Sequence, residues 1–117
     1  MAVSKIKGDA GDTISISVDD TLFSSSTANS IIAFRRNNVV HVQFWGCTPI
    51  FTGVKYSVVT GLPKAALNAT AGVYKGGTAS NVSLGNAYIN GGQTTISMNI
   101  TSANTQIYGS LIYVAND

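Results

Sequence analysis

The residues best equipped for chemistry gather in one stretch of the sequence, residues 30–47. This stretch, SIIAFRRNNVVHVQFWGC, contains the chain's single His, single Trp and single Cys together with both arginines. A thiol beside an imidazole base can act as an activated nucleophile, so His41 and Cys47 form one candidate dyad. The two residues are separated by a strand end and a Trp-Gly turn, and an incidental spacing explains them better.

Other kinds of catalysis lack the residues they need. The chain has no Glu, and no Asp occurs between Asp20 and Asp117, so the carboxylate pair of a glycosidase is missing from the body of the sequence. A Ser-His-Asp triad would have to orient His41 with an N-terminal Asp or with Asp117, and no nucleophile-elbow motif is present. One His and one Cys are too few for a zinc or iron site. The sequence therefore predicts no enzyme activity, no metal and no cofactor.

The few charges of the chain disfavour nucleic-acid binding. Charged residues make up 10% of the chain, against roughly 25% in an average globular protein. Arg35, Arg36, Lys55, Lys64 and Lys75 form no basic run interleaved with aromatics. Separated cations can attract an anionic partner such as a phosphorylated polysaccharide, but a solvated surface explains them more simply.

Aromatic side chains suggest a second kind of site, one that binds sugars. An exposed ring stacks on the apolar face of a sugar while a few polar groups bind its hydroxyls. Trp45 is favoured because its strand runs there into a Gly-Cys-Thr-Pro loop. Core packing explains each tyrosine equally well; those considered are Tyr56, Tyr74, Tyr88 and Tyr108.

The elements that must position these residues are strands. TISISV, residues 13–18, alternates apolar and polar side chains. Asn37-Asn38 suits a two-residue hairpin turn, because Asn tolerates positive φ. The register that follows pairs Arg35 with Val40, Ala33 with Val42, Ile31 with Phe44, Phe34 with His41, and Ile32 with Gln43.

One face of this first hairpin is apolar, and the other is mixed and aromatic. A strand that is apolar on both faces is buried on both, or docks a partner on one. We therefore expect Phe34 and Ile32 to contact a neighbouring subunit. His41 lies in the same mixed face, where a hydrogen-bonded interface or surface histidine is a simpler interpretation than a ligand-binding one.

The last two strand regions complete the pattern. Around NGG, a three-residue loop at residues 90–92 is preferred, because a two-residue loop would put Leu84 and Met98 on opposite faces. The expected pairs are Tyr88 with Thr94, Asn86 with Ile96, Leu84 with Met98, and Val82 with Ile100. The final strand, TQIYGSLIYVA, is again apolar on both faces, so we expect it to be central or to contact a subunit through Tyr108 and Ile112.

Turn signals about every ten residues, without a long helical pattern, predict an all-β protein, an antiparallel sandwich of jelly-roll type. Residues 13–117 are expected to be this domain, and KAALNATA within it to be a loop. Residues 1–12 would be a leader whose GDAGDT is either a Gly/Asp turn or the stub of a collagen-like stalk. A lone Cys forms no intrachain disulfide, and no run is long enough to span a membrane.

Four segments in order, AFRRNNVVHVQF, YSVVTGLPKAA, YINGGQTTISMNI and IYGSLIYVAND, resemble the C-terminal head domains of bacteriophage tail-fibre and baseplate receptor-binding proteins. The resemblance covers about residues 30–117. It implies a homotrimeric β-sandwich head in the virion, made in the bacterial cytoplasm, joined to other tail proteins through its N-terminus and bound to host cell-surface saccharide. Lactococcal-phage heads hold saccharide with Trp, His, Arg and Asp, which makes candidates of Trp45, His41, Arg35 and Arg36, with Tyr74 beside them.

Three hypotheses follow. The first is a trimeric adhesin head that binds saccharide without catalysis or membrane insertion. The second is a structural virion module, a decoration or collar protein with the same fold and no ligand. The third is a hydrolase that uses Cys47 or His41.

Overall fold

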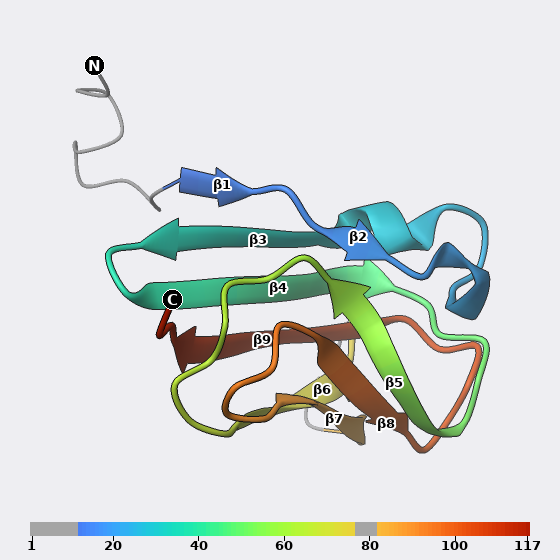
Figure 1. Cartoon of the computed structure of the whole chain (residues 1–117). Coiled ribbons are helices and arrows are strands. Elements are labelled where there is room, and N and C mark those ends of the chain that lie inside the picture. The colour runs from blue at the N-terminus through green and yellow to red at the C-terminus, as the bar shows by residue number, and fades with distance from the viewer. Residues whose placement is uncertain (1–11, 77–81) are drawn as a thin grey trace.

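The computed structural model describes residues 12–76 and 82–117 and shows an all-β protein (Figure 1). Every described strand pair is antiparallel, which confirms the all-β antiparallel prediction. The strands are β1 (Asp12–Ile14), β2 (Ser17–Val18), β3 (Ile31–Arg36), β4 (Val39–Cys47), β5 (Gly53–Thr60), β6 (Ala69–Lys75), β7 (Ser83–Ile89), β8 (Ile96–Ile100) and β9 (Ile107–Val114). Two short 3-10 turns, η2 (Asp20–Leu22) and η3 (Thr27–Ser30), precede β3.

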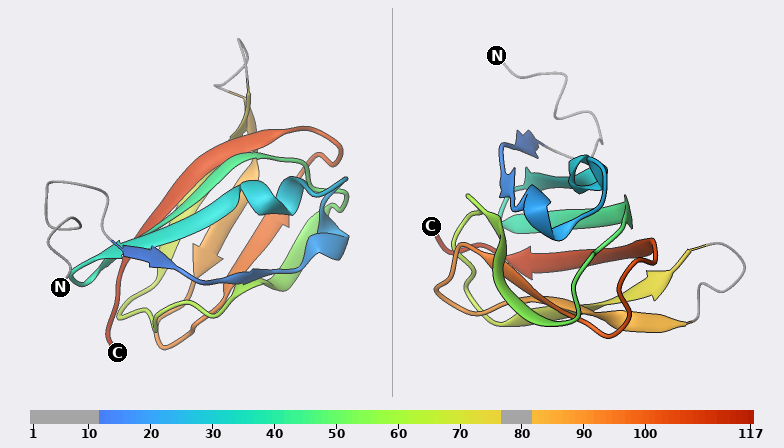
Figure 2. Two further views of the ribbon diagram at one scale, coloured as in Figure 1. Left: turned by 90° about the horizontal axis from the view of Figure 1, so that it is seen from above. Right: turned by 90° about the vertical axis from the view of Figure 1, so that its right-hand side faces the viewer.

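The described strands form one curled sheet in the order β1-β3-β4-β9-β6-β7-β8-β5-β2. Its two outermost strands, β1 and β2, are consecutive in the chain. β1 pairs with β3 at one end of the sheet, and β2 pairs with β5 at the other end. One extended segment, residues 12–18, therefore connects the two ends of the sheet. Figure 2 shows how the sheet curls over, and the buried hydrophobic side chains of the described residues form one core cluster.

The core follows from the alternation of side chains along the strands. In β4, Val40, Val42 and Phe44 are fully buried, while His41 and Trp45 point to the other side of the sheet. Strand β8 buries Ile96, Met98 and Ile100 in the same way. Burying a side chain of this size contributes about 1.5–3 kcal/mol relative to leaving it in water.

The first hairpin has the register that its sequence predicts. Ala33 lies opposite Val42, and Phe34 lies opposite His41. The turn uses Asn37 at a φ of 56°, a positive value that Asn accepts readily. The last strand also lies centrally, as expected, with β4 on one side and β6 on the other.

The register predicted for the second hairpin is wrong. Asn86 lies opposite Asn99 and Ala87 opposite Met98, and six residues, 90–95, separate β7 from β8. The loop is long because it bonds to another segment: Gly92 N–H donates to the Ala65 carbonyl at 2.8 Å.

Gly85 explains why the predicted register is wrong, because that register assumed strict alternation of side chains along β7. Gly85 adopts a φ of +131° beside an irregularity in the β6–β7 pairing. The local change of direction lets both Leu84 and Ala87 face the core, although strict alternation would separate them. Leu84 and Met98 are thus both buried without being paired.

Two further predictions concern a loop before β6 and an N-terminal leader. The stretch KAALNATA, predicted to be a loop, runs into β6, which begins at Ala69. The predicted leader, residues 1–12, lies outside the described residues except for Asp12, the first residue of β1. Among the residues described, no helix is long and apolar enough to cross a membrane.

Candidate functional site

The side of the sheet that faces away from the core across β3, β4, β9 and β6 carries most of the predicted site residues. We call this surface the outer face. Its apolar and aromatic members are Ile32, Phe34, Val39, His41, Trp45, Tyr74, Tyr108, Ile112 and Val114.

Strand pairing arranges the outer face in rows. One row runs from Phe34 through His41 to Ile112, and the Phe34 and His41 rings lie 4.7 Å apart between centroids. A second row runs from Trp45 through Tyr108 to Tyr74. Trp45 meets Tyr108 edge to face, with the centroids 5.0 Å apart and the rings at 89°, a favourable geometry for aromatic pairs.

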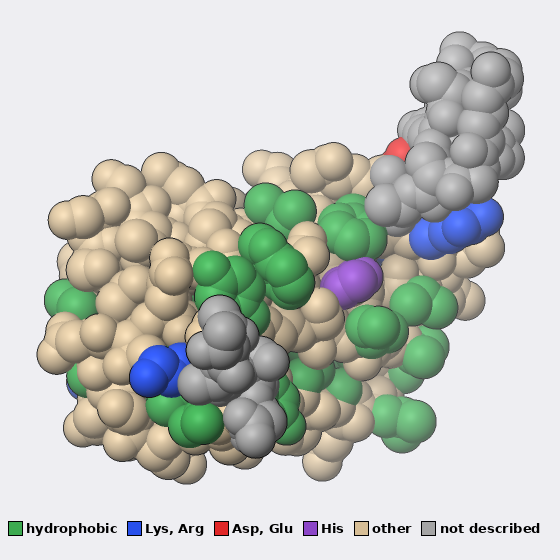
Figure 3. All heavy atoms as spheres, turned by 180° about the vertical axis from the view of Figure 1, so that it is seen from behind, with side chains coloured by type: hydrophobic (Ala, Val, Ile, Leu, Met, Phe, Trp, Pro, Cys, Tyr) green, Lys and Arg blue, Asp and Glu red, His purple; other side chains and the backbone are tan. Residues whose placement is uncertain are grey.

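The outer face is exposed in the single chain despite its apolar character. Trp45 is 59% exposed and Ile112 57% exposed, and Ile32, Val39 and Val114 are each close to half exposed. Figure 3 shows these hydrophobic side chains gathered around the chain's single histidine. A contiguous apolar patch of this kind marks an interaction surface more often than an ordinary protein exterior.

One polar atom in the outer face is buried without a hydrogen bond. His41 Nε2 has almost no contact with solvent and no partner within the described part of the chain. Gln43 and Ser110 lie opposite each other in the adjacent row of the same face. A buried polar atom costs free energy unless it is paired, so this imidazole nitrogen is an unsatisfied group of the single chain.

The two arginines do not share one location. Arg35 belongs to the core-facing register, opposite Val40, and binds Asp117 through Nη1 and Nη2, each at 2.9 Å. The hydrogen bond from Arg35 holds the pKa of the Asp117 carboxyl below its ordinary value, and the same bond raises the pKa of Arg35. Arg36 lies opposite Val39 at the hairpin end of the outer face.

The candidate dyad of His41 and Cys47 does not form. Cys47 is fully buried in the core, whereas His41 lies on the outer face. Burial raises the pKa of the Cys47 thiol to about 12, which disfavours the thiolate that nucleophilic chemistry needs. Asp117, one of the carboxylates considered for a triad with His41, is held by Arg35 instead.

The described residues contain no group of three or more His, Cys, Asp and Glu side chains that could hold a metal ion. Comparison with known proteins finds no matching family model, no similar curated protein and no similar solved structure. The function must therefore be argued from the surface itself.

The structure brings two predicted sets of residues onto the same surface. Trp45, His41 and Tyr74 were expected to bind ligand. They share the outer face with the expected subunit contacts Phe34, Ile32, Tyr108 and Ile112. Val39 and Val114 extend the face and were not singled out, although both occupy outward positions in strands whose alternation was visible. A surface covered by a neighbouring subunit cannot also be an open ligand site, so the two roles compete.

Proposed function

We propose that this chain is a phage receptor-binding head domain that assembles as a homotrimer through the outer face and attaches the virion to host saccharide without catalysis. The order of the sequence segments that resemble such heads supports the class. The curled sheet, whose two halves enclose one core, is compatible with the jelly-roll-like sandwich of that class.

The observation that carries the proposal is the outer face. Its apolar and aromatic members carry no charge, and Arg36 lies at the hairpin end of the face, so burying the centre of the face against an identical copy removes no charge from water. Removing a charge from water without a partner is costly, whereas aromatic and aliphatic side chains are typical of the centre of subunit interfaces.

Sedimentation velocity at micromolar concentration tests the assembly. We expect a trimer for the wild-type chain and a monomer for Ile112→Lys, which places a charge in the middle of the outer face. Val54→Lys is the matched control, because Val54 is an exposed valine on β5. A wild-type monomer across this range would contradict the proposal.

The structural virion module remains the second candidate, and one observation favours it. Trimerisation through the outer face would cover Trp45, His41 and Tyr74, the residues first expected to bind saccharide. A glycan array distinguishes the candidates: a trimer that binds no glycan supports the structural module, and a trimer that binds glycan supports the adhesin.

A further inference from the structure

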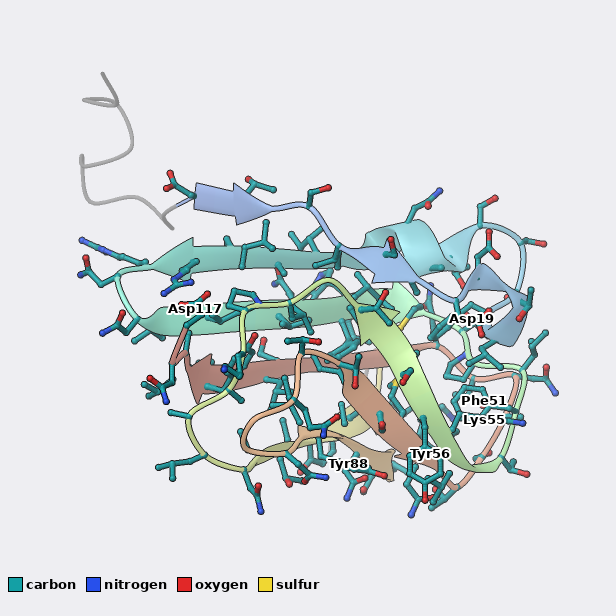
Figure 4. All side chains as sticks on the ribbon, viewed as in Figure 1. Asp19, Phe51, Lys55, Tyr56, Tyr88 and Asp117 are labelled. Atoms are coloured by element: carbon teal, nitrogen blue, oxygen red, sulfur yellow. The ribbon has the colours of Figure 1, made fainter. Side chains whose placement is uncertain are left out.

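A pocket opens between β5, β7 and β8, strands that do not contribute to the outer face. Its volume is about 180 Å³, and Figure 4 shows Tyr56 and Tyr88 on this lower side of the sheet. Tyr56, Ser57, Tyr88, Asn90, Gln93, Thr95 and Ser97 line it.

A large bulge in β5 builds one wall of the pocket. Lys55 lies opposite Met98 and Val59 opposite Ile96, so residues 56–58 face the single residue Ser97. Ser57 takes a φ of 55° there, and its N–H donates to Ser97 Oγ at 3.3 Å. Bulges of this kind change the direction of a side chain next to a functional site, and here Tyr56 projects from the strand and is 75% exposed.

The loop between β7 and β8 builds the opposite wall and is fixed in place. Gln93 N–H donates to the Asn90 carbonyl at 3.0 Å, and Gly91 N–H donates to Asn68 Oδ1 at 2.7 Å. These bonds order the loop before any ligand arrives. A site ordered in advance binds more tightly, because less conformational freedom is lost on binding.

The lining is uncharged and rich in groups that both donate and accept hydrogen bonds. It combines two tyrosines, three hydroxyl side chains and two amides. Such groups match sugar hydroxyls, which also donate and accept. The tyrosine rings offer apolar surface to the C–H faces of a sugar ring, and the absence of a cation from this lining disfavours a phosphate or a carboxylate.

We propose that the pocket between Tyr56 and Tyr88 binds one residue of a neutral saccharide. The inference takes its class of ligand, a saccharide, from the proposed adhesin function. It places the binding site in this pocket instead of at Trp45. Because the pocket lies on strands that do not contribute to the outer face, assembly through that face does not need to cover it. Three weak sites on one assembly then raise the overall affinity through avidity.

Saturation-transfer NMR and calorimetry test the site with a panel of neutral hexoses and N-acetylhexosamines and with glucuronic acid as the charged control. We expect millimolar binding of at least one neutral sugar and no binding of glucuronic acid. Tyr56→Ala and Tyr88→Ala should each weaken that binding about tenfold. Tyr56→Phe should retain most of the binding, because the ring remains.

Val54→Ala is the control, since Val54 is exposed on β5 but lies neither in the pocket lining nor on the outer face, and Tyr74→Ala and Trp45→Ala probe the alternative site on the outer face. Thermal melting shows whether each variant folds, and Gln93→Ala provides a second pocket variant should Tyr88→Ala unfold. Sugar binding that survives both pocket substitutions but is lost in Tyr74→Ala or Trp45→Ala overturns the pocket and leaves the adhesin function standing. If wild type binds neither this panel nor any glycan on an array, the pocket and the adhesin function both fail, while the sedimentation result for the trimer is unaffected.

Discussion

Arg35 holds Asp117 through two parallel hydrogen bonds of 2.9 Å and at the same time donates from Nε to the Asn37 carbonyl at 2.7 Å. The turn of the first hairpin and the segment that follows β9 are therefore connected by one guanidinium group. This bidentate geometry is the most directional form of ion pair in proteins. It gives Arg35 a structural role, and the ligand-binding role expected from the sequence stays a prediction.

The Arg35–Asp117 pair makes stability depend on pH in acid. Because the pKa of Asp117 is lower in the folded chain than its ordinary value, the stabilisation is complete above about pH 4 and is lost as the pH falls through the folded value. Asp117→Asn should therefore lower the melting temperature at pH 7 but have a shrinking effect below pH 4. Thermal melts from pH 2 to pH 7 measure the difference in melting temperature between wild type and Asp117→Asn. A difference that stays the same at every pH would contradict the prediction.

Gly85 should tolerate no side chain. A Cβ there would overlap the Asn99 carbonyl oxygen, and the φ of +131° suits only glycine. Gly85→Ala should lower the free energy of unfolding by about 2–4 kcal/mol. Gly53→Ala is the control, because Gly53 also has a positive φ but open space around it. Urea unfolding compares the two, and equal losses would show that strain alone, without overlap, determines the cost.

Adjacent residues of β4 should differ sharply in their effect on stability. Phe44 is fully buried, so Phe44→Ala should cost about 3–5 kcal/mol. Trp45 is 59% exposed, and Trp45→Ala should cost much less in the monomer. Denaturant unfolding measures both losses in the free energy of unfolding. The measurements use the Ile112→Lys background, where assembly is expected to be absent. A large loss for Trp45→Ala in that background would mean that the outer face packs within one chain.

Tyr113 should ionise only at high pH. Burial raises its pKa to about 12, and its hydroxyl donates to the Pro63 carbonyl at 2.7 Å. Its contribution to stability is complete below about pH 10, where the unfolded tyrosine begins to ionise, and falls as the pH rises toward 12. Tyrosinate absorbance should show one late-titrating group in the wild type, and that group should be missing in Tyr113→Phe.

Cys47 should resist alkylation until the chain unfolds. Desolvation in the core raises the pKa of the thiol to about 12, so the thiolate is scarce at neutral pH and also out of reach. Iodoacetamide at pH 8 should modify Cys47 slowly in buffer and rapidly in urea. Equal rates in the two solutions would show that the core opens around β4.

The sequence was most informative where contacts are local. The pairing of Phe34 with His41 followed from a two-residue Asn-Asn turn and an unbroken alternation of side chains, and nothing distant disturbs it. The same reasoning gave the wrong register for the second hairpin. Its loop bonds to Ala65 and Asn68, and Gly85 breaks the alternation, so the register depends on partners that the local sequence does not reveal.

The pocket was harder to foresee than the outer face. Tyr56 and Tyr88 were each considered as sugar-stacking residues, but nothing in their spacing indicated that the two would meet. The bulge in β5 and the loop at residues 90–95 bring them together with Ser97. By contrast, the outer face required only the alternation of side chains in strands that are apolar on both sides, so its residues were recognisable in advance.

The strands at the two borders of the curled sheet are very short, because β1 has three residues and β2 has two. In the described strand pairing β2 covers only Val59 and Thr60 of β5, so the residues of β5 before them are the place where a foreign strand could extend the ladder.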